Sequence, residues 1–294
     1  MKIPIYIADL THTNGGIMAL THPLGTAYVA AYCQEVFKNN FDISLFKFPV
    51  DLIKKLNKKT PKILAFSNYS WNVELSYEIA KWVKTNNPNT VTVFGGPNFP
   101  TEVDEQKEFL SQRKFIDFYI QTEGEIGFAS LIEQLIKFQF NITALKEKKI
   151  AITNSVYLSD NEICCGNNER IKDVNILPSP YLTGILDEFF DMPLTPMFET
   201  TRGCPFSCSF CADGIKIKTK IHRFSPERVR EELYYIGNHV TKTDEIIVTD
   251  LNFGMYEQDI ETAKVIAELQ SKLKWPIIVK GSAGKNKPER IIEV

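Results

Sequence analysis

Short β-rich runs and amphipathic segments alternate along residues 1–138. The runs predicted as strands are Ile3–Ala8, Ile43–Phe48, Ile63–Ser67, Val91–Gly95 and Asp117–Gln121. Between them, apolar residues recur at three- and four-residue steps, which predicts a buried stripe on each helix. These stripes are Val29/Cys33/Val36, Leu75/Ile79/Trp82 and Phe128/Leu131/Ile132/Leu135. The alternation predicts a parallel sheet with helices on both faces, which is a doubly wound, flavodoxin-like (Rossmann-like) α/β domain.

A second βα series begins at residue 195, after a segment of different character. Residues 139–194 hold a predicted hairpin, Ser155–Leu158 with Glu162–Cys165, and a Pro-rich crossing, so we expect a packed linker. The later strands are predicted at Met197–Thr200, Glu245–Thr249 and Ile277–Lys280, with helices from Ser225 and over Glu257–Lys274. Ser225 followed by Pro226 is a typical helix start. This series predicts the first units of a β/α barrel.

The predicted barrel is short. A complete barrel takes on the order of 200 residues or more, about twice the stretch from Pro196 to Val294. Its third strand would lie at an open sheet edge, with a third helix opening at Pro288. We therefore expect three regions, 1–138, 139–194 and a truncated barrel at 195–294. Such a chain would be an inactive fragment of a longer protein, or would be completed by another polypeptide.

Composition and charge narrow the class of protein. Of the 294 residues, 44% are hydrophobic and 24% charged, as in ordinary globular proteins. A net charge of −2 gives no electrostatic footprint for nucleic acid, and the Lys-rich residues 54–62 are expected to form a solvated helix face. No apolar segment approaches the about 20 residues of a membrane span, and the N-terminal run is too short for a signal sequence. These features predict a cytoplasmic protein without membrane or nucleic-acid partners.

Half of the six cysteines lie in one motif, Glu199-Thr-Thr-Arg-Gly-Cys204-Pro-Phe-Ser-Cys208-Ser-Phe-Cys211. A cubane cluster has four irons, so three thiolates from one loop leave one iron open for a substrate or cofactor. The alternative is a structural zinc site, in which His222 would complete a Cys3His set. The remaining cysteines do not form a secreted disulfide framework, and Cys33 is expected in the core.

The spacing C-x3-C-x2-C, with Phe210 before the last cysteine and the lead-in Thr-Arg-Gly-Cys-Pro, resembles the radical S-adenosylmethionine (SAM) enzymes. The resemblance implies that Cys204, Cys208 and Cys211 hold a [4Fe-4S] cluster whose open iron chelates SAM. An electron from the cluster then cleaves the sulfonium to a 5′-deoxyadenosyl radical. It also implies SAM contacts near Phe210 and at Asp250 and Asn252, although an Asp capping the next helix would look the same. An electron donor such as flavodoxin or ferredoxin is implied as a partner.

Unusual residues also follow three of the N-terminal strands. They are Ser67-Asn-Tyr69, Gly95-Gly96-Pro97 and Glu123-Gly124. Ligands bind beyond the carboxyl ends of such strands, and paired glycines let the backbone approach a large planar ligand. Together with His22–Ala31 and the linker Leu177–Tyr181, these pieces are similar, in order, to the radical SAM subfamily with an N-terminal cobalamin-binding domain.

That resemblance implies that cobalamin contacts Ser67, Tyr69, Gly95, Gly96, Pro97, Glu123 and Gly124. His12 lies in a D-x-H-x-x-G-like segment whose spacing is one residue too long, so we do not expect it to coordinate cobalt. A domain that keeps the fold and has lost the ligand is the alternative.

The activity implied is transfer of a methyl group from methylcobalamin to an unactivated carbon or phosphorus of a small molecule or peptide. A radical rearrangement or ring contraction remains open, as does a non-catalytic cobalamin- or metal-binding module with structural zinc. The related methylthiotransferases of transfer RNA are disfavoured, because their N-terminal domain carries three further cluster cysteines and this one has only Cys33.

Overall fold

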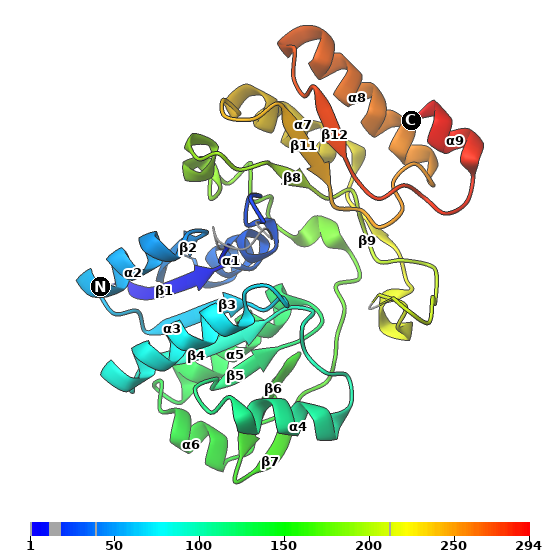
Figure 1. The fold of residues 1–294 in the computed structure, drawn as a ribbon. Coiled ribbons are helices and arrows are strands. Elements are labelled where there is room, and N and C mark those ends of the chain that lie inside the picture. Colours follow the sequence, from blue (N-terminus) through cyan, green and yellow to red (C-terminus); the bar gives the residue numbers. More distant parts are fainter. Residues whose placement is uncertain (1, 12–18, 39, 212) are drawn as a thin grey trace. The chain divides into compact units, whose positions relative to one another are not determined.

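A computed structural model describes residues 2–11, 19–38, 40–211 and 213–294 (Figure 1). The chain divides into two compact units. The first contains the residues up to Ala19 and Gly25–Ile171, and the second contains Leu20–Leu24 and Lys172–Val294. Leu20–Leu24 joins the second unit because Thr21 pairs with Thr195 in an isolated parallel bridge.

The first unit is built on a seven-stranded sheet in the order β2-β1-β3-β4-β5-β6-β7. Its strands are β1 (Ile3–Ala8), β2 (Phe41–Phe46), β3 (Ile63–Ser67), β4 (Val91–Gly95), β5 (Phe118–Ile120), β6 (Ser155–Ser159) and β7 (Glu162–Cys165). The first five are parallel, in the flavodoxin-like order 2-1-3-4-5, which confirms the predicted fold class. β1, β3 and β4 have the predicted bounds, whereas β2 lies two residues earlier and β5 is shorter at both ends.

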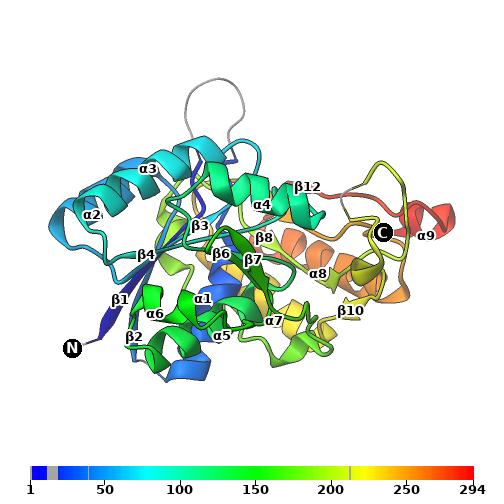
Figure 2. The same cartoon turned by 90° about the horizontal axis from the view of Figure 1, so that it is seen from below.

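Helices cover both faces of this sheet. They are α1 (Leu24–Phe37), α2 (Pro49–Lys58), α3 (Val73–Asn86), α4 (Val103–Gln112), α5 (Gly124–Lys137) and the short α6 (Ile142–Glu147). Figure 2 shows α2, α3 and α4 on one side and α1, α5 and α6 on the other. On the first side, alternate strand residues such as Tyr6, Leu64 and Phe94 form a core with Leu52 and Ile79 of the helices.

Two members of the predicted helix stripes were placed wrongly. Val36 of α1 is 39% exposed and Trp82 of α3 is 43% exposed, whereas both were expected in the core. Cys33 is fully buried, as predicted. The reason for the error in α1 is that alanines, including Ala27 and Ala30, form much of its buried face, so the largest apolar residues do not mark it.

The predicted hairpin is present but is not a linker. β6 pairs with β5 in antiparallel fashion, through Tyr119 with Val156 and Ile120 with Ser155, and therefore extends the sheet. Val156 and Ser155 are fully buried. The first unit consequently continues to Ile171, whereas the sequence predicted a boundary at 138. The local pattern identified the hairpin, but its pairing partner lies more than 30 residues away.

The second unit contains a three-stranded parallel sheet in the order β12-β11-β8. Its elements are β8 (Met197–Phe198), β11 (Glu245–Val248), β12 (Ile278–Lys280), α7 (Pro226–His239), α8 (Glu257–Leu273) and α9 (Pro288–Glu293), with the antiparallel pair β9 (Thr201–Arg202) and β10 (His222–Arg223) and the 3-10 turns η1 (Val174–Ile176), η2 (Asp187–Asp191) and η3 (Lys216–Lys218).

Strands alternate with helices in this unit as the predicted barrel series requires. Ser225 caps α7 by accepting a hydrogen bond from the Arg228 backbone N–H, as expected from the sequence. β8 is two residues shorter than predicted, and the separate strand β9 begins at Thr201. β12 lies at the edge of the sheet with its three residues exposed.

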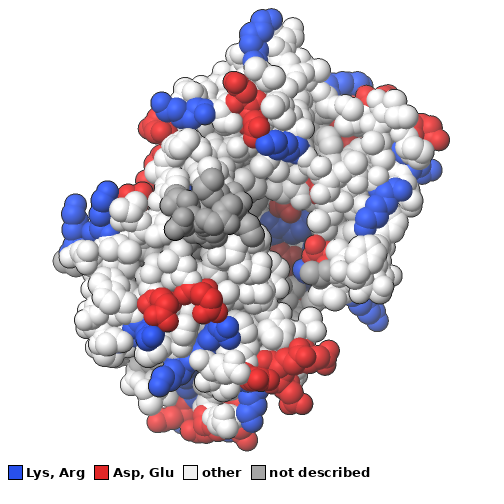
Figure 3. All heavy atoms as spheres, viewed as in Figure 1, with Lys and Arg blue, Asp and Glu red and all other residues white. Residues whose placement is uncertain are grey.

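Two surface properties bear on possible partners. Within the described ranges, no helix has the length and apolar character needed to cross a membrane. Figure 3 shows Lys and Arg side chains interspersed with Asp and Glu on the face in view. This mixture agrees with the weak net charge and provides no basic surface there for a polyanion.

Candidate functional site

The three motif cysteines lie in a loop, here called the cysteine loop (residues 204–211), which follows β8 and β9. The carboxyl ends of parallel barrel strands are where this class of fold places its chemistry. Gly203 enters the loop with a φ of +108°, and a Cβ there would lie 2.4 Å from the Lys220 carbonyl oxygen. The Cys204 N–H then donates to the Lys218 carbonyl at 3.0 Å. A glycine is therefore required at the entrance to the loop.

Side chains from two other strand ends reach the cysteine sulfurs. The Asn252 Nδ2 group, after β11, donates to Cys204 Sγ at 3.2 Å. The Lys285 Nζ group, after β12, donates to Cys208 Sγ at 3.4 Å. Cys204 is buried, whereas Cys208 and Cys211 are partly exposed. The loops that follow all three strands of this sheet thus meet at the cysteine loop.

His222 is the residue that would complete the zinc alternative. It lies in β10, and its Nδ1 atom is 2.7 Å from the Lys172 carbonyl oxygen. Among the residues that the structure describes, no group of three His, Cys, Asp or Glu side chains could hold a metal ion. A cubane makes a different demand, because each thiolate binds a different iron and the sulfurs need not converge on one point.

Asp250, expected at the SAM site, joins two strand ends. Its Oδ1 atom accepts a hydrogen bond from the Thr200 N–H at 2.8 Å, and its other carboxylate oxygen pairs with the Thr200 hydroxyl. Burial raises the pKa of Asp250 to about 7, although the bonds from Thr200 act in the opposite direction. Both carboxylate oxygens are thus used to hold the residue that precedes the β9 strand.

Asn252 and Phe210, the other two residues expected to contact SAM, differ in their exposure to solvent. Asn252 is buried, and its Oδ1 atom has no hydrogen-bond partner among the described residues. A buried acceptor of this kind beside Cys204 is suited to a ligand that brings N–H groups. The Phe210 side chain is 89% exposed, so what it offers next to Cys211 is backbone and an uncovered ring.

The residues predicted to contact cobalamin follow adjacent strands. β3, β4 and β5 are neighbours in the sheet, so their carboxyl ends lie at one edge. Gly96 has a φ of +130°, and a Cβ there would lie 2.7 Å from the Asn68 carbonyl oxygen. Gly96 and Pro97 are exposed. This edge therefore offers accessible backbone in a conformation that excludes other residues, which fits the close approach of a planar ligand.

A polar link that the sequence did not reveal fixes this edge. The Asn68 Nδ2 group donates to the Tyr119 hydroxyl at 2.9 Å and to the Asn98 carbonyl at 2.8 Å. The Tyr119 hydroxyl in turn donates to the Gly96 carbonyl at 2.9 Å. Asn68 and Tyr119 are fully buried. Only the position of Asn68 after β3 and that of Tyr119 within β5, two strands that become neighbours of β4 on folding, could have suggested this link.

Two of the predicted cobalamin contacts have side chains that are engaged within the protein. The Ser67 hydroxyl donates to Asp9 Oδ1 at 2.5 Å, and the Lys47 ammonium binds the other Asp9 oxygen at 2.7 Å. The Glu123 carboxylate accepts from Arg170 Nε at 2.9 Å in a buried ion pair. These bonds stabilise the carboxyl edge of the sheet. At this edge, the backbone is then the part of the chain that a ligand can contact.

Three more predicted positions complete the picture. The Tyr69 ring stacks on Trp71 at a centroid distance of 4.4 Å, and burial raises the pKa of Tyr69 to about 12. Gly124 begins α5, and a Cβ there would lie 3.0 Å from the Val29 side chain. His12 lies outside the described residues.

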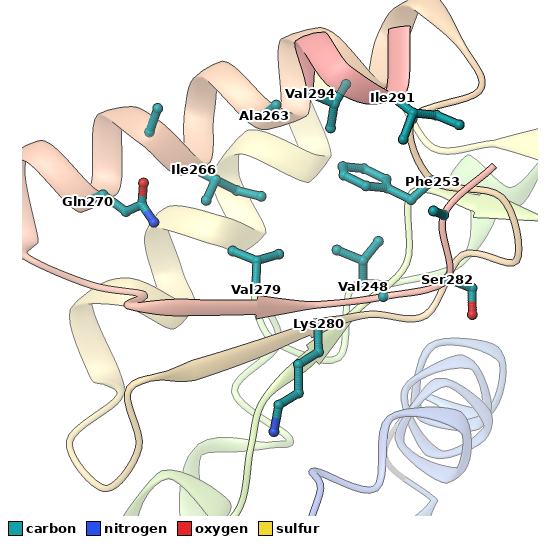
Figure 4. Close-up of a pocket in the computed structure, with 14 residues that line it drawn as sticks. Val248, Phe253, Ala263, Ile266, Gln270, Val279, Lys280, Ser282, Ile291 and Val294 are labelled. Carbon is teal, nitrogen blue, oxygen red and sulfur yellow. The ribbon is translucent and has the colours of Figure 1, made fainter. Parts of the chain in front are cut away.

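The second unit also contains a pocket of about 360 Å³ on the helix side of its sheet. Figure 4 shows Val248 and Val279 pointing from the strands toward Ile266 of α8, while Lys280 points to the opposite side of the sheet. None of the motif cysteines lines this pocket. It belongs to the layer between sheet and helices and is separate from the cysteine loop.

Comparison with known proteins finds relatives that align with most of the chain. Residues 16–132 match the family model described as the B12 binding domain. Over 260 residues, 85% of this chain, it is 28% identical to the cobalamin-dependent radical SAM methyltransferase TokK of Streptomyces tokunonensis. The chain is a relative of the cobalamin-dependent radical SAM enzymes. Most of the residues that match the B12 binding domain lie in the first unit, and the motif that resembles the radical SAM enzymes lies in the second.

Two further comparisons support this relationship. The 2-(S-pantetheinyl)-carbapenam-3-carboxylate methyltransferase of Streptantibioticus cattleyicolor is also 28% identical over 260 residues. The solved structure of the cobalamin-dependent radical SAM enzyme OxsB, with aqua-cobalamin and SAM bound, has a TM-score of 0.69 over 92% of this chain at 16% identity. It shows that the fold is shared. The chain spans 37% of the length of each of these three relatives.

Proposed function

We propose that this B12-binding radical SAM relative takes part in methyl transfer to an unactivated carbon or phosphorus. The observation that carries the proposal is one chain in which a B12-binding domain precedes a three-cysteine loop at the carboxyl edge of a parallel sheet. In this proposal the protein works in the cytoplasm on a small molecule or peptide, with electrons from a flavodoxin- or ferredoxin-like donor.

In the radical SAM unit, Cys204, Cys208 and Cys211 would hold a [4Fe-4S] cluster. When bound, such a cluster supplies the electron that splits the sulfonium of SAM. The free acceptor of Asn252 is suited to the amino group of SAM, which is a hydrogen-bond donor. Asp250 would support this site by holding Thr200, to which its carboxylate is hydrogen-bonded.

In the B12-binding domain, the backbone at Gly95, Gly96 and Pro97 would lie against the corrin ring. When bound, methylcobalamin supplies the methyl group. The Asn68–Tyr119 link holds Gly96 in its left-handed conformation, and the Asp9–Ser67 bond fixes the end of β3. The contribution of these side chains is therefore to keep the binding edge rigid before the ligand arrives.

The first test is cofactor loading. The protein is reconstituted anaerobically with iron and sulfide, incubated with hydroxocobalamin and desalted, and its ultraviolet–visible spectrum is recorded. We expect both the cluster and the corrin absorption. Replacing Cys204, Cys208 and Cys211 with Ala should remove iron and sulfide, while Cys33→Ala, which changes a buried core cysteine, serves as the control. Iron retained in the triple variant would refute the ligand assignment.

The second test separates methyl transfer from other radical chemistry. Loaded protein is given SAM and a strong reductant, and the products are quantified. Formation of both S-adenosylhomocysteine and 5′-deoxyadenosine supports methyl transfer. Formation of 5′-deoxyadenosine alone favours the rearrangement or ring-contraction alternative. Retention of cobalamin with zinc in place of iron would support the non-catalytic module.

A further inference from the structure

Lys285 is held beside the cysteine loop by backbone pairing between two strand-end loops. After β11 and β12, Phe253 and Ala283 form a parallel bridge. The Phe253 N–H donates to the Ser282 carbonyl at 2.9 Å, and the Gly284 N–H donates to the Phe253 carbonyl at 2.8 Å. The Phe253–Ala283 bridge and its two hydrogen bonds thus fix the backbone next to Lys285.

The Lys285 side chain contacts the cysteine loop in two ways. Its Nζ atom donates to Cys208 Sγ at 3.4 Å and lies 5.2 Å from the centroid of the Phe206 ring. Within the described part of the chain, Lys285 forms no ion pair with a carboxylate. Its charge is therefore directed at the sulfurs.

The sulfurs of Cys204 and Cys208 accept hydrogen bonds from different kinds of donor. Cys204 receives a hydrogen bond from the neutral amide of Asn252, whereas Cys208 receives one from the charged ammonium of Lys285. Hydrogen bonds to cluster sulfurs and nearby charge are among the features that set the reduction potential of an iron–sulfur cluster. A fixed positive charge favours the reduced cluster, which carries one more negative charge than the oxidised cluster.

We propose that Lys285 sets the reduction potential of the cluster, raising it through its charge and its N–H···S bond to Cys208. This inference rests on the proposed function, because it requires the cysteine loop to hold a cluster. It assigns Lys285 a role toward the protein's own cofactor ligands rather than toward the substrate. A merely structural lysine would affect cluster content but would leave the potential of an assembled cluster unchanged.

The test is a redox titration of reconstituted protein without SAM, in which the reduced cluster is followed by electron paramagnetic resonance. Lys285→Met keeps most of the side-chain length and removes the charge, so we expect its midpoint potential to shift to a more negative value. Lys285→Arg retains the charge and should stay close to the unchanged protein. Lys287→Met, which alters an exposed lysine in the same loop, is the matched control and should not shift.

Salt provides an independent readout. Lys285 is exposed, so its charge is screened by ions, and the difference between the unchanged protein and Lys285→Met should narrow at high ionic strength. An unchanged midpoint in Lys285→Met, with normal iron and sulfide content, would overturn the proposal. If Lys285→Met fails to assemble a cluster, Lys285→Gln is titrated against the same expectation. Failure of the unchanged protein to hold iron and sulfide would instead refute the proposed function.

Discussion

At the scale of single residues, Asp250 is a buried acid. Its two carboxylate oxygens accept hydrogen bonds from the backbone N–H and the hydroxyl of Thr200. Burial raises its pKa from 3.8 to about 7. Between these values the folded protein keeps a proton that the unfolded chain has released. The contribution of Asp250 to stability is therefore greatest at low pH and falls as the pH rises through this window.

We expect Asp250→Asn to flatten this part of the pH dependence. The amide can still accept from the Thr200 N–H and can donate to the Thr200 hydroxyl, so it resembles the protonated acid. The substitution should remove a pH-dependent contribution to the free energy of unfolding of about 4 kcal/mol at most, which corresponds to a pKa shift of about three units. It is measured by urea unfolding at pH 5 to 8, followed by Trp275 fluorescence after Trp71 and Trp82 are replaced by Phe.

Glu261→Gln is the control for this experiment, because it changes an exposed carboxylate paired with Lys264 in α8. It should leave the pH slope of the second unit close to that of the unchanged protein. If Asp250→Asn shows the same slope as the unchanged protein between pH 5 and 7, the acid does not titrate as its burial indicates.

Gly96 is a residue of the first unit where the lack of a side chain matters, because its φ is positive and its surroundings are close. A Cβ at its φ of +130° would lie 2.7 Å from the Asn68 carbonyl oxygen. We expect Gly96→Ala to destabilise this unit by about 1 to 3 kcal/mol and to reduce the hydroxocobalamin retained after desalting. Gly25→Ala, where an added Cβ meets nothing within 4 Å, should do neither. Normal corrin retention in Gly96→Ala would place the binding face elsewhere.

At the scale of elements, Tyr119 connects three strands that are far apart in the sequence. It lies in β5, bonds to Asn68 after β3 and donates to Gly96 after β4. Tyr119→Phe removes both of these hydrogen bonds, so we expect a loss of about 1 to 3 kcal/mol. Hydrogen exchange of the segment around Gly96 should accelerate, and corrin retention should fall.

Tyr157→Phe is the matched control for this prediction. Its hydroxyl is also in a buried tyrosine of the same sheet, but donates to the Ile150 carbonyl at 2.8 Å. We expect a similar loss of stability without faster exchange around Gly96. Equal corrin retention in the two variants would mean that the Asn68–Tyr119 link does not shape the binding edge.

At the scale of the whole molecule, the chain consists of two compact units that carry different ligand sites. The cysteine loop is held by contacts within the second unit, and the Gly96 edge by contacts within the first. Each cofactor should therefore load without the other. We expect the triple cysteine variant to lose iron and keep cobalt, and Gly96→Val to lose cobalt and keep iron.

Iron and cobalt in the same desalted samples, measured by elemental analysis, provide the readout for this expectation. The unchanged protein loaded with one cofactor at a time is the reference. Loss of both metals in either variant, in protein that remains folded by circular dichroism, would show that the two sites depend on each other.

The sequence by itself determined the elements, the doubly wound class of the first unit and the cysteine motif, because periodicity and spacing are local properties of the chain. β1, β3 and β4 were predicted to the residue for this reason. The residues that follow β3, β4 and β5 could also be selected from the sequence as candidate ligand contacts, because ligands bind beyond the carboxyl ends of such strands.

Only the tertiary structure decided which side chains remain available at those ends. The side chains of Ser67, Glu123 and Asp250 bond to Asp9, Arg170 and Thr200, each more than 40 residues away. The same holds for β6, which joins β5, and for Lys285, which reaches Cys208 across 77 residues. Hydrogen bonds between residues this far apart in the sequence form only when separate strands become neighbours in the folded chain. A local pattern of residues does not predict which strands will be neighbours.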